Sequence, residues 1–440
     1  MIKMVLYMKI FFLFIFLTLS FSFENKNNLY YEYNITFHKY EPLFHSRPIL
    51  DSLNFYNPTI KFGLGTPKQY FEISVDTTTS YAWFVSNNLN NYFNNTFNYN
   101  ASSTNLYIQV INTVLLEGCI LTGVFMKDIP SPFLTENEIE KKFVFGLMKD
   151  TNLKSKIIYK DGNMGLMRDV PNNNRRGNES MSYMEYLMDN KAINKQIFSI
   201  EYYDNYTGGK IIFGEKYNNN NNKTYKINYC QNSLNKDYNN FWVCHLNYII
   251  YNNLKLYAID TEQVLFDSLN PFIISPRESG TFLLKNMLKN NENFCEIIQE
   301  ESYSFLKCLN NFDYLNYIYP IKLNIGETNI VLFPKNLFIN YKNQFYICLL
   351  IVDDNENENW NLGIPAFLNN IFIFNQEIKK FGILEPNQIY YNLYYLLSFI
   401  IIILIFFIVL MIIRRKHIID NLPKNIDIDF EITSNKENLL

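Results

Sequence analysis

The chain has 440 residues, a formal net charge of -3 at pH 7 and a hydrophobic content of 48%. That length exceeds what one hydrophobic core usually supports, so it predicts two lobes plus accessory segments. The charge balance excludes the strongly basic surface that nucleic-acid binding requires, and we expect no nucleic-acid partner. The sequence has no CxxC pair and only 4 His, so we predict neither a metal site nor a cofactor.

The N-terminus has the pattern of a secretory signal. Lys3 and Lys9 precede the apolar run 10–17, and small polar residues follow it. A positively charged start, an apolar stretch and small residues near a cleavage site are typical of such signals. We therefore predict a signal peptide at residues 1–22, and the alternative is an uncleaved membrane anchor.

Between the two ends of the chain, the hydrophobic periodicity indicates mainly β structure with a few short helices. It predicts an alternating strand at 70–75, a hairpin strand at 210–214 and a buried strand at 371–374. Helical spacing is limited to 182–189 and 281–288. The expected fold class is therefore mainly β.

Two apolar, strand-like runs end in an aspartate that a hydroxyl residue follows. Asp76-Thr77 ends the first run, and Asp267-Ser268 ends the second. Two strand ends can place two carboxylates at one point, where they cannot both ionise and share a proton. One carboxylate then acts as base on a water and the other as acid toward a carbonyl. Taken singly, each Asp is also compatible with an ordinary turn or cap.

Six cysteines in a body that faces an oxidising compartment are expected to be structural. The spacing predicts two local bridges: Cys230 with Cys244, and Cys308 with Cys348. Cys119 and Cys295 remain, and they either pair across the lobes or stay free. Four, five or six bridged cysteines all fit the sequence.

The C-terminal region contains a candidate membrane anchor. Residues 393–413 are almost entirely apolar and carry no charge. Because about 20 such residues cross a bilayer as a helix, we predict a transmembrane helix at 391–413 with the lipid bilayer as its partner. Tyrosines precede this run and the basic residues 414–417 follow it, which places the tail 414–440 in the cytosol. The prediction is a single-pass type I membrane protein of the secretory pathway with a lumenal or extracellular body.

Seven ordered motifs resemble those of the pepsin-like aspartic peptidases, the A1 family, from about residue 55 to residue 386. In chain order they are 62–71 with Asp76 and Trp83, 161–166, 196–199, 208–214, Asp267-Ser268 with Ser275-Pro276, 360–368, and 380–383. The Asn-rich loops and the frequent Tyr and Ile suggest a plasmepsin-like relative.

The resemblance implies a bilobal β fold in which each lobe supplies one aspartate to a cleft that holds an extended peptide. Asp76 and Asp267 are then the catalytic pair, and the partner is a polypeptide substrate or peptide ligand. The hydroxyl and amide side chains that follow the two acids are expected to join and support their loops: Thr77, Thr79, Ser268 and Asn270.

The same resemblance divides the body of the chain. It implies a pro-segment-like region at 23–53, an N-terminal lobe at 54–215 and a C-terminal lobe at 216–388. It also implies a hairpin, the flap, that covers the cleft and includes Val110, Ile111 and Asn112.

The sequence departs from the family pattern at the two acidic loops. The family has a glycine two residues after each aspartate, and here Thr78 and Leu269 occupy those positions. A side chain at these points is expected to push the carboxylates apart or to twist the amides that support them.

Two further departures affect the cleft. Val110 stands where the family has a flap tyrosine, and Ile364 replaces the acidic residue that usually follows Leu-Gly. Losing the tyrosine weakens water exclusion by the flap, and losing the acid removes a polar partner from the floor of the cleft.

These observations leave two functional hypotheses. The first is a membrane-anchored aspartic endopeptidase, made as a zymogen, in which hydrolysis by Asp76 and Asp267 is weakened. The second is an inactive pseudoprotease that keeps the cleft as a surface for binding peptides or partners. A structural surface protein that uses neither cleft nor acids is a third possibility.

Overall fold

The computed structural model describes residues 29–40, 49–50, 53, 55–89, 95–116, 119–133, 140–151, 161–168, 182–217, 225–230, 240–258, 262–289, 291–352, 359–386 and 388–420. The predicted signal peptide at 1–22 and most of the predicted tail lie outside these residues. The chain divides into two units, Met1–Glu385 and Pro386–Leu440.

The first unit is mainly β, as predicted, and its largest sheet has 13 strands. In order across the sheet they are β11 (Tyr225–Tyr229), β26 (Lys380–Pro386), β25 (Ile371–Asn375), β9 (Ile197–Tyr202), β10 (Gly209–Gly214), β1 (Tyr30–Tyr40), β2 (Phe55–Leu64), β3 (Gln69–Asp76), β8 (Gly162–Gly165), β4 (Trp83–Val85), β7 (Phe143–Thr151), β6 (Cys119–Asp128) and β5 (Leu106–Leu116). Because β25 pairs with β9, backbone hydrogen bonds join the two halves of the sequence within one sheet.

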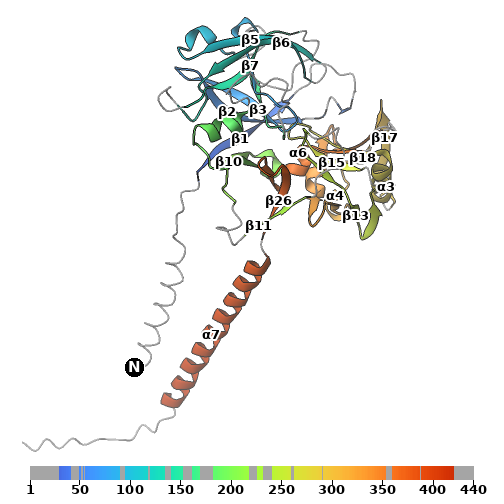
Figure 1. The fold of residues 1–440 in the computed structure, drawn as a ribbon. Coiled ribbons are helices and arrows are strands. Elements are labelled where there is room, and N and C mark those ends of the chain that lie inside the picture. The colour runs from blue at the N-terminus through green and yellow to red at the C-terminus, as the bar shows by residue number, and fades with distance from the viewer. Residues whose placement is uncertain are drawn as a thin grey trace, which may run out of the picture. The chain divides into compact units, whose positions relative to one another are not determined.

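Two further sheets belong to the downstream half. The 9-stranded sheet contains β12 (Val243–His245), β15 (Gln263–Phe266), β24 (Asn359–Leu362), β16 (Ile273–Ser275), β23 (Leu349–Val352), β18 (Tyr303–Leu309), β22 (Gln344–Ile347), β21 (Phe338–Tyr341) and β17 (Cys295–Glu300). The 4-stranded sheet contains β14 (Leu254–Tyr257), β13 (Tyr248–Tyr251), β19 (Ile321–Asn324) and β20 (Asn329–Leu332). Figure 1 shows β5, β6 and β7 on one side of this unit and β13, β17, β18 and α3 (Arg277–Leu288) on the other.

The other helices of this unit are short. They are α2 (Tyr183–Asp189), α4 (Tyr314–Tyr317), α5 (Pro334–Leu337) and α6 (Ile364–Phe367). The two helices predicted from spacing are confirmed as α2 and α3, although α3 begins earlier than expected, directly after Pro276. Ser182 caps the start of α2. Its hydroxyl accepts from the Glu185 backbone amide, and its own backbone amide donates to the Glu185 carboxylate, which forms a capping box.

The two halves repeat one strand arrangement. In the upstream half, β3 runs parallel to β8, β8 antiparallel to β4, and β4 parallel to β7. In the downstream half, β15, β24, β16 and β23 follow the same sequence of parallel, antiparallel and parallel pairs. β3 ends at the first acidic loop and β15 at the second, so the repeat places the two aspartates at equivalent points.

β1 comes from the region predicted to resemble a pro-segment, and it lies inside the largest sheet. It pairs with β10 on one side and with β2 on the other. Tyr33 and Ile35 are buried in the main hydrophobic core, and the Tyr33 hydroxyl lies 2.7 Å from the Tyr183 hydroxyl. This strand therefore contributes to the folded core.

One predicted disulfide is confirmed and the other is wrong. Cys230 is bonded to Cys244, as the spacing indicated. Cys308 is bonded to Cys295 because these residues face each other across the β17–β18 hairpin, with their Cα atoms 4.0 Å apart. Cys348 is buried and free. Cys119 lies in β6, and its side chain is outside the described part of the structure.

The second unit contains α7 (Gln388–Asp420). Its segment Ser398–His417 is long and apolar enough to cross a membrane. The helix extends beyond both ends of the predicted span 391–413, and it continues through the basic residues after residue 413, which are compatible with helical structure.

The first prediction concerns β1. Ile35→Ala should lower the free energy of unfolding by about 2 to 5 kcal/mol because it removes a buried side chain. Thr36→Ala, on the exposed face of the same strand, should change it by no more than about 0.5 kcal/mol. Urea unfolding of the two variants measures both values. Equal, small effects would show that β1 is not part of the stable core.

Candidate active site

Asp76 is the last residue of β3, and its side chain is fully buried. The alternation of β3 places Ile73 and Val75 in the core, and the parallel pairing with β8 sets Asp76 opposite Gly165. The Asp76 carbonyl accepts from the Leu166 amide at 2.7 Å, which extends this pairing beyond the strand end. The buried strand thus ends in an aspartate whose backbone is held by its pairing with β8 and by the Leu166 amide.

Asp267 follows β15 directly and occupies the equivalent position in the downstream half. Its amide donates to the Leu362 carbonyl at 3.0 Å, so β24 fixes it much as β8 fixes Asp76. The residue as a whole is partly exposed.

Hydrogen bonds between Thr77 and Ser268 join the two acidic loops, which we define as residues 76–80 and 267–271. The Thr77 hydroxyl donates to the Phe266 carbonyl at 2.8 Å, and the Ser268 hydroxyl donates to the Val75 carbonyl at 2.7 Å. Each hydroxyl oxygen also accepts from the backbone amide of the other residue, at 3.1 Å in both cases. We call this set the inter-loop hydrogen bonds.

Backbone amides support both carboxyl groups. The Thr78 amide donates to Asp76 Oδ1 at 2.7 Å. The amides of Leu269 and Asn270 donate to Asp267 Oδ1 at 3.1 and 3.2 Å. The side chains at positions 78 and 269 do not prevent these amides from donating, and their effect on the separation of the two carboxyl groups stays a prediction. Neither Thr78 nor Leu269 has a positive φ, so neither position requires glycine for its backbone conformation.

The close approach that does require glycine lies on the neighbouring strands. A Cβ on Gly165 would lie 2.7 Å from the Thr79 carbonyl oxygen, and one on Gly363 would lie 2.1 Å from the Asn270 carbonyl oxygen. These two glycines let β8 and β24 pass directly against the acidic loops.

Three loop side chains make contacts that the sequence did not predict. The Thr78 hydroxyl donates to Asp76 Oδ1 at 2.6 Å, so the residue that replaces a glycine adds a donor. The Thr79 hydroxyl accepts from the side-chain amide of Asn163 at 2.6 Å. The Asn270 side-chain oxygen accepts from the Phe272 amide at 3.0 Å, so this side chain stabilises its own loop while its backbone supports Asp267.

Sequence reasoning missed two asparagines that contact the acids. Asn163 Nδ2 lies 3.3 Å from Asp76 Oδ2, and Asn361 Nδ2 lies 3.4 Å from Asp267 Oδ2. A signal was present in the motifs at 161–166 and 360–368, where each asparagine interrupts a strand whose other residues are mostly apolar.

Sequence reasoning also missed Tyr202, whose hydroxyl donates to the Ser268 carbonyl at 3.1 Å from the end of β9. Burial raises the pKa of this phenol well above its ordinary value, and the charges of Asp267 and Asp76 act in the same direction. Tyr202 is therefore a neutral hydrogen-bond donor beside the two acids.

The environment of Asp267 raises the pKa of its carboxyl group. Burial raises the pKa of Asp267 to about 6, and the nearby Asp76 carboxyl acts in the same direction. Donation from Leu269, Asn361 and Asn270 lowers this pKa in part. Below about pH 6, Asp267 therefore carries a proton while Asp76 has a hydroxyl and an amide donor on one oxygen.

The model of the family described as eukaryotic aspartyl protease matches residues 56–385, which is most of the chain. The chain belongs to the eukaryotic aspartyl protease family. Among curated proteins, no sequence matches it. The bilobal, pepsin-like fold expected from the motifs agrees with this membership and with the mainly β structure.

Two features of this aspartyl protease homologue concern the cleft. Val110, Ile111 and Asn112 lie in β5, which forms a hairpin with β6, but their side chains are outside the described part of the structure. Ile364 begins α6 and is fully buried, and its amide donates to the Asn270 carbonyl at 2.7 Å. Position 364 therefore joins the second acidic loop through its backbone and carries a buried apolar side chain.

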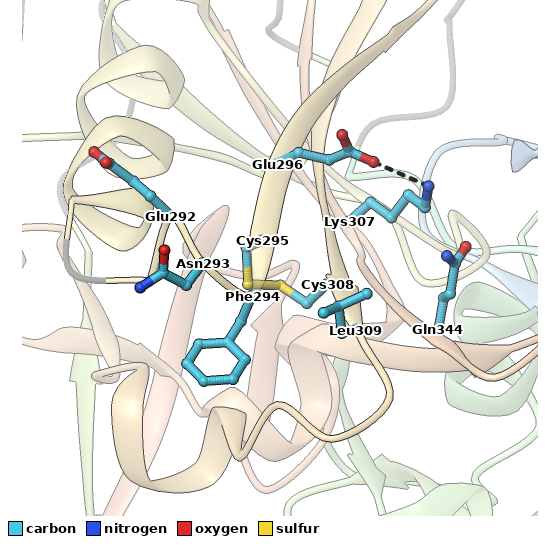
Figure 2. Close-up of a pocket in the computed structure, with 9 residues that line it drawn as sticks. All are labelled: Glu292, Asn293, Phe294, Cys295, Glu296, Lys307, Cys308, Leu309 and Gln344. Carbon is cyan, nitrogen blue, oxygen red and sulfur yellow. Dashed lines mark hydrogen bonds and ion pairs between the residues drawn. A yellow bond between two sulfur atoms is a disulfide. The ribbon is translucent and has the colours of Figure 1, made fainter.

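The homologue also has a pocket that is lined by charged, amide and apolar side chains around a disulfide. It lies at the β17–β18 hairpin around the disulfide of Cys295 and Cys308, and Glu296 forms an ion pair with Lys307 beside it (Figure 2). Neither aspartate lines this pocket. Among the described residues, no group of three or more His, Cys, Asp or Glu is arranged to hold a metal ion.

The second prediction tests the inter-loop hydrogen bonds by a double-mutant cycle. Thr77→Val and Ser268→Ala remove both sides of the contact, so their effects on the free energy of unfolding should be non-additive by about 0.5 to 3 kcal/mol. Thr78→Val, combined with the same Ser268→Ala, is the matched control and should show additive effects, since Thr78 donates to Asp76 instead. Additivity in both cycles would contradict the assignment.

Proposed function

We propose that the protein is a membrane-anchored aspartic endopeptidase that cleaves extended peptides under acidic conditions. The observation that carries the proposal is the support around the two acids. Inter-loop hydrogen bonds join their loops, and each carboxyl group accepts backbone amides despite the missing glycines. Small displacements of catalytic groups are costly, so this support favours retained catalysis over a merely retained fold.

The proposed mechanism uses the unequal environments of the two acids. Ionised Asp76 takes a proton from a water molecule, whose oxygen attacks the peptide carbonyl carbon. Asp267 gives its proton to the carbonyl oxygen, which yields a neutral tetrahedral diol. The diol then collapses: the proton on Asp76 passes to the amide nitrogen, the C–N bond breaks, and Asp267 recovers its proton from a diol hydroxyl.

The proposed topology follows from the covalent structure and the apolar helix. Two disulfides in the body suit an oxidising compartment, and α7 supplies the segment that would cross a bilayer. With a signal peptide at 1–22, the body would lie in the lumen or outside the cell and residues 414–440 in the cytosol. The polypeptide substrate would then be a secreted or membrane-bound chain.

The proposed division into lobes is 54–215 and 216–388, preceded by the pro-segment-like region 23–53. Residues at the end of that region contact the downstream lobe. The amides of Ile49 and Leu50 donate to the Glu300 carboxylate at 2.7 and 2.9 Å. Cleavage between Tyr40 and Ile49 would therefore leave contacts on both sides of the cut.

The alternative is a pseudoprotease that binds peptides without cleaving them. The buried, apolar Ile364 and the Val110 in β5 favour this alternative, because they remove a polar group near Asp267 and the flap tyrosine.

The third prediction separates the two functions. The full-length chain in detergent should cleave a fluorogenic peptide most rapidly at acidic pH, and the rate should fall as pH rises through about 6, where Asp267 loses its proton. Asp76→Asn and Asp267→Asn should each reduce kcat by about a factor of 10⁴ or more, in line with the loss of a catalytic unit. Asp313→Asn, at the exposed start of α4, is the control and should leave the rate unchanged.

A pepstatin-type inhibitor should compete with the peptide. Saturable peptide binding without cleavage at any pH, unaffected by Asp76→Asn, would overturn the proposed activity and support the pseudoprotease.

A further inference from the structure

Asn163 and Asn361 occupy equivalent positions in the two halves. In the upstream half, β3 and β8 pair in parallel with Val75 opposite Met164 and Asn163 one register position earlier. In the downstream half, β15 and β24 pair in the same way, with Phe266 opposite Leu362 and Asn361 one position earlier. The strand arrangement that the two halves share therefore has an asparagine at the same register position in each half.

The two side chains share one contact, although Asn163 Nδ2 also donates to the Thr79 hydroxyl at 2.6 Å. Each Nδ2 donates to the Oδ2 oxygen of the aspartate in its own half, at 3.3 Å for Asn163 and 3.4 Å for Asn361. Each Oδ1 atom is buried and has no hydrogen-bond partner. In both halves, Oδ1 of the aspartate accepts from the loop and Oδ2 accepts from the asparagine.

Folding alone does not account for this pair. A buried acceptor without a partner destabilises the folded state, whereas an apolar side chain at either position would fill a strand interior with no such penalty. Both halves nevertheless contain the same amide in the same place. The contact that both amides share is the one to a carboxylate, while Asn163 also supports its loop through Thr79.

We propose that Asn163 and Asn361 are positioning residues that hold the Oδ2 oxygens of Asp76 and Asp267 and set the pH range in which the pair carries one proton. This proposal rests on the proposed function and deepens it. An amide N–H donates a stronger hydrogen bond to a carboxylate than to a protonated carboxyl group, so each asparagine favours the ionised form of its acid. With both amides present, the pair therefore takes up a second proton only at a lower pH than it would without them.

The groups that act on the pair come from three elements. Asp76 ends β3, Asp267 follows β15, and Tyr202 extends from β9. Tyr202 stays neutral through the acidic range because burial and both acids raise its pKa. Changes in the pH profile of an asparagine variant therefore report on the two carboxyl groups.

The fourth prediction uses Asn→Leu variants, which keep the approximate side-chain shape and remove the donor. In the full-length chain in detergent, Asn361→Leu should move the high-pH limb of the cleavage profile upward by about one to two pH units, as loss of a hydrogen bond to a charged group implies. The double variant that combines Asn361→Leu with Asn163→Leu should move both the low-pH limb and the high-pH limb of the cleavage profile to higher pH. We treat the limbs as properties of the coupled pair.

Asn324→Leu is the matched control. Asn324 is a buried asparagine whose side-chain amide donates to Thr328 and Asn329 in the 4-stranded sheet, so this variant should lose stability without moving either limb. Where Asn361→Leu fails to fold, Asn361→Val replaces it, since valine suits a strand and also lacks a donor.

A second readout does not depend on catalysis. Because Asp267 has a pKa of about 6 in the folded protein and an ordinary value of 3.8, the folded state binds the extra proton between these values, and stability should fall as pH rises through that window. Asp267→Asn should abolish this fall in melting temperature, and Asn361→Leu should extend it to higher pH.

The two readouts distinguish the two proposals. If the unaltered chain cleaves no peptide, the proposed function fails, and the melting profile still decides the role of Asn361. If Asn361→Leu folds and leaves both the cleavage limb and the melting profile where they are in the unaltered chain, the positioning role is overturned.

Discussion

The inter-loop hydrogen bonds of Thr77 and Ser268 are the constraint on which the site depends. Each hydroxyl donates to a carbonyl at the end of the opposite strand and accepts the opposite amide, so neither loop can move without breaking bonds in the other half. The strands that precede these two residues, β3 and β15, pair in parallel with β8 and β24. The sheet in each half therefore fixes the backbone position of its aspartate. Hydrogen bonds between two sheets that are separated in sequence thereby hold the two acidic loops against each other.

The supports around the carboxyl groups explain how the site tolerates unusual loop residues. Glycine would be needed at positions 78 and 269 only if the backbone there had a positive φ or another backbone lay against the Cα, and the close approaches instead occur at Gly165 and Gly363. Thr78 adds a hydroxyl donor to the Asp76 carboxyl group, whereas the donors to Asp267 are all amides and burial raises the pKa of Asp267. A residue that departs from the family pattern thus gives Asp76 a hydrogen bond that Asp267 lacks, so the two carboxyl groups have different environments.

Much of the fold followed from the sequence because the relevant signals are local. Alternation predicted the strand at 70–75, and apolar spacing predicted the helix at 182–189 that the structure shows as α2. The pairing of Cys295 with Cys308 could not be predicted in this way, because it depends on the register of a hairpin that the spacing of cysteines does not reveal. The asparagine contacts depend on strand register too, and they emerge only once β8 and β24 are set beside the strands that end in the acids.

The central claim is that Asp76 and Asp267 lie close enough to share one proton. The most direct test is the ¹³C NMR titration of the Asp267 carboxyl group in the full-length chain, with and without Asp76→Asn. The account predicts titration near pH 6 in the unaltered chain and at a clearly lower pH in the variant, because the neighbouring negative charge is removed. An identical titration in both proteins would show that the two acids do not interact, and would contradict the account.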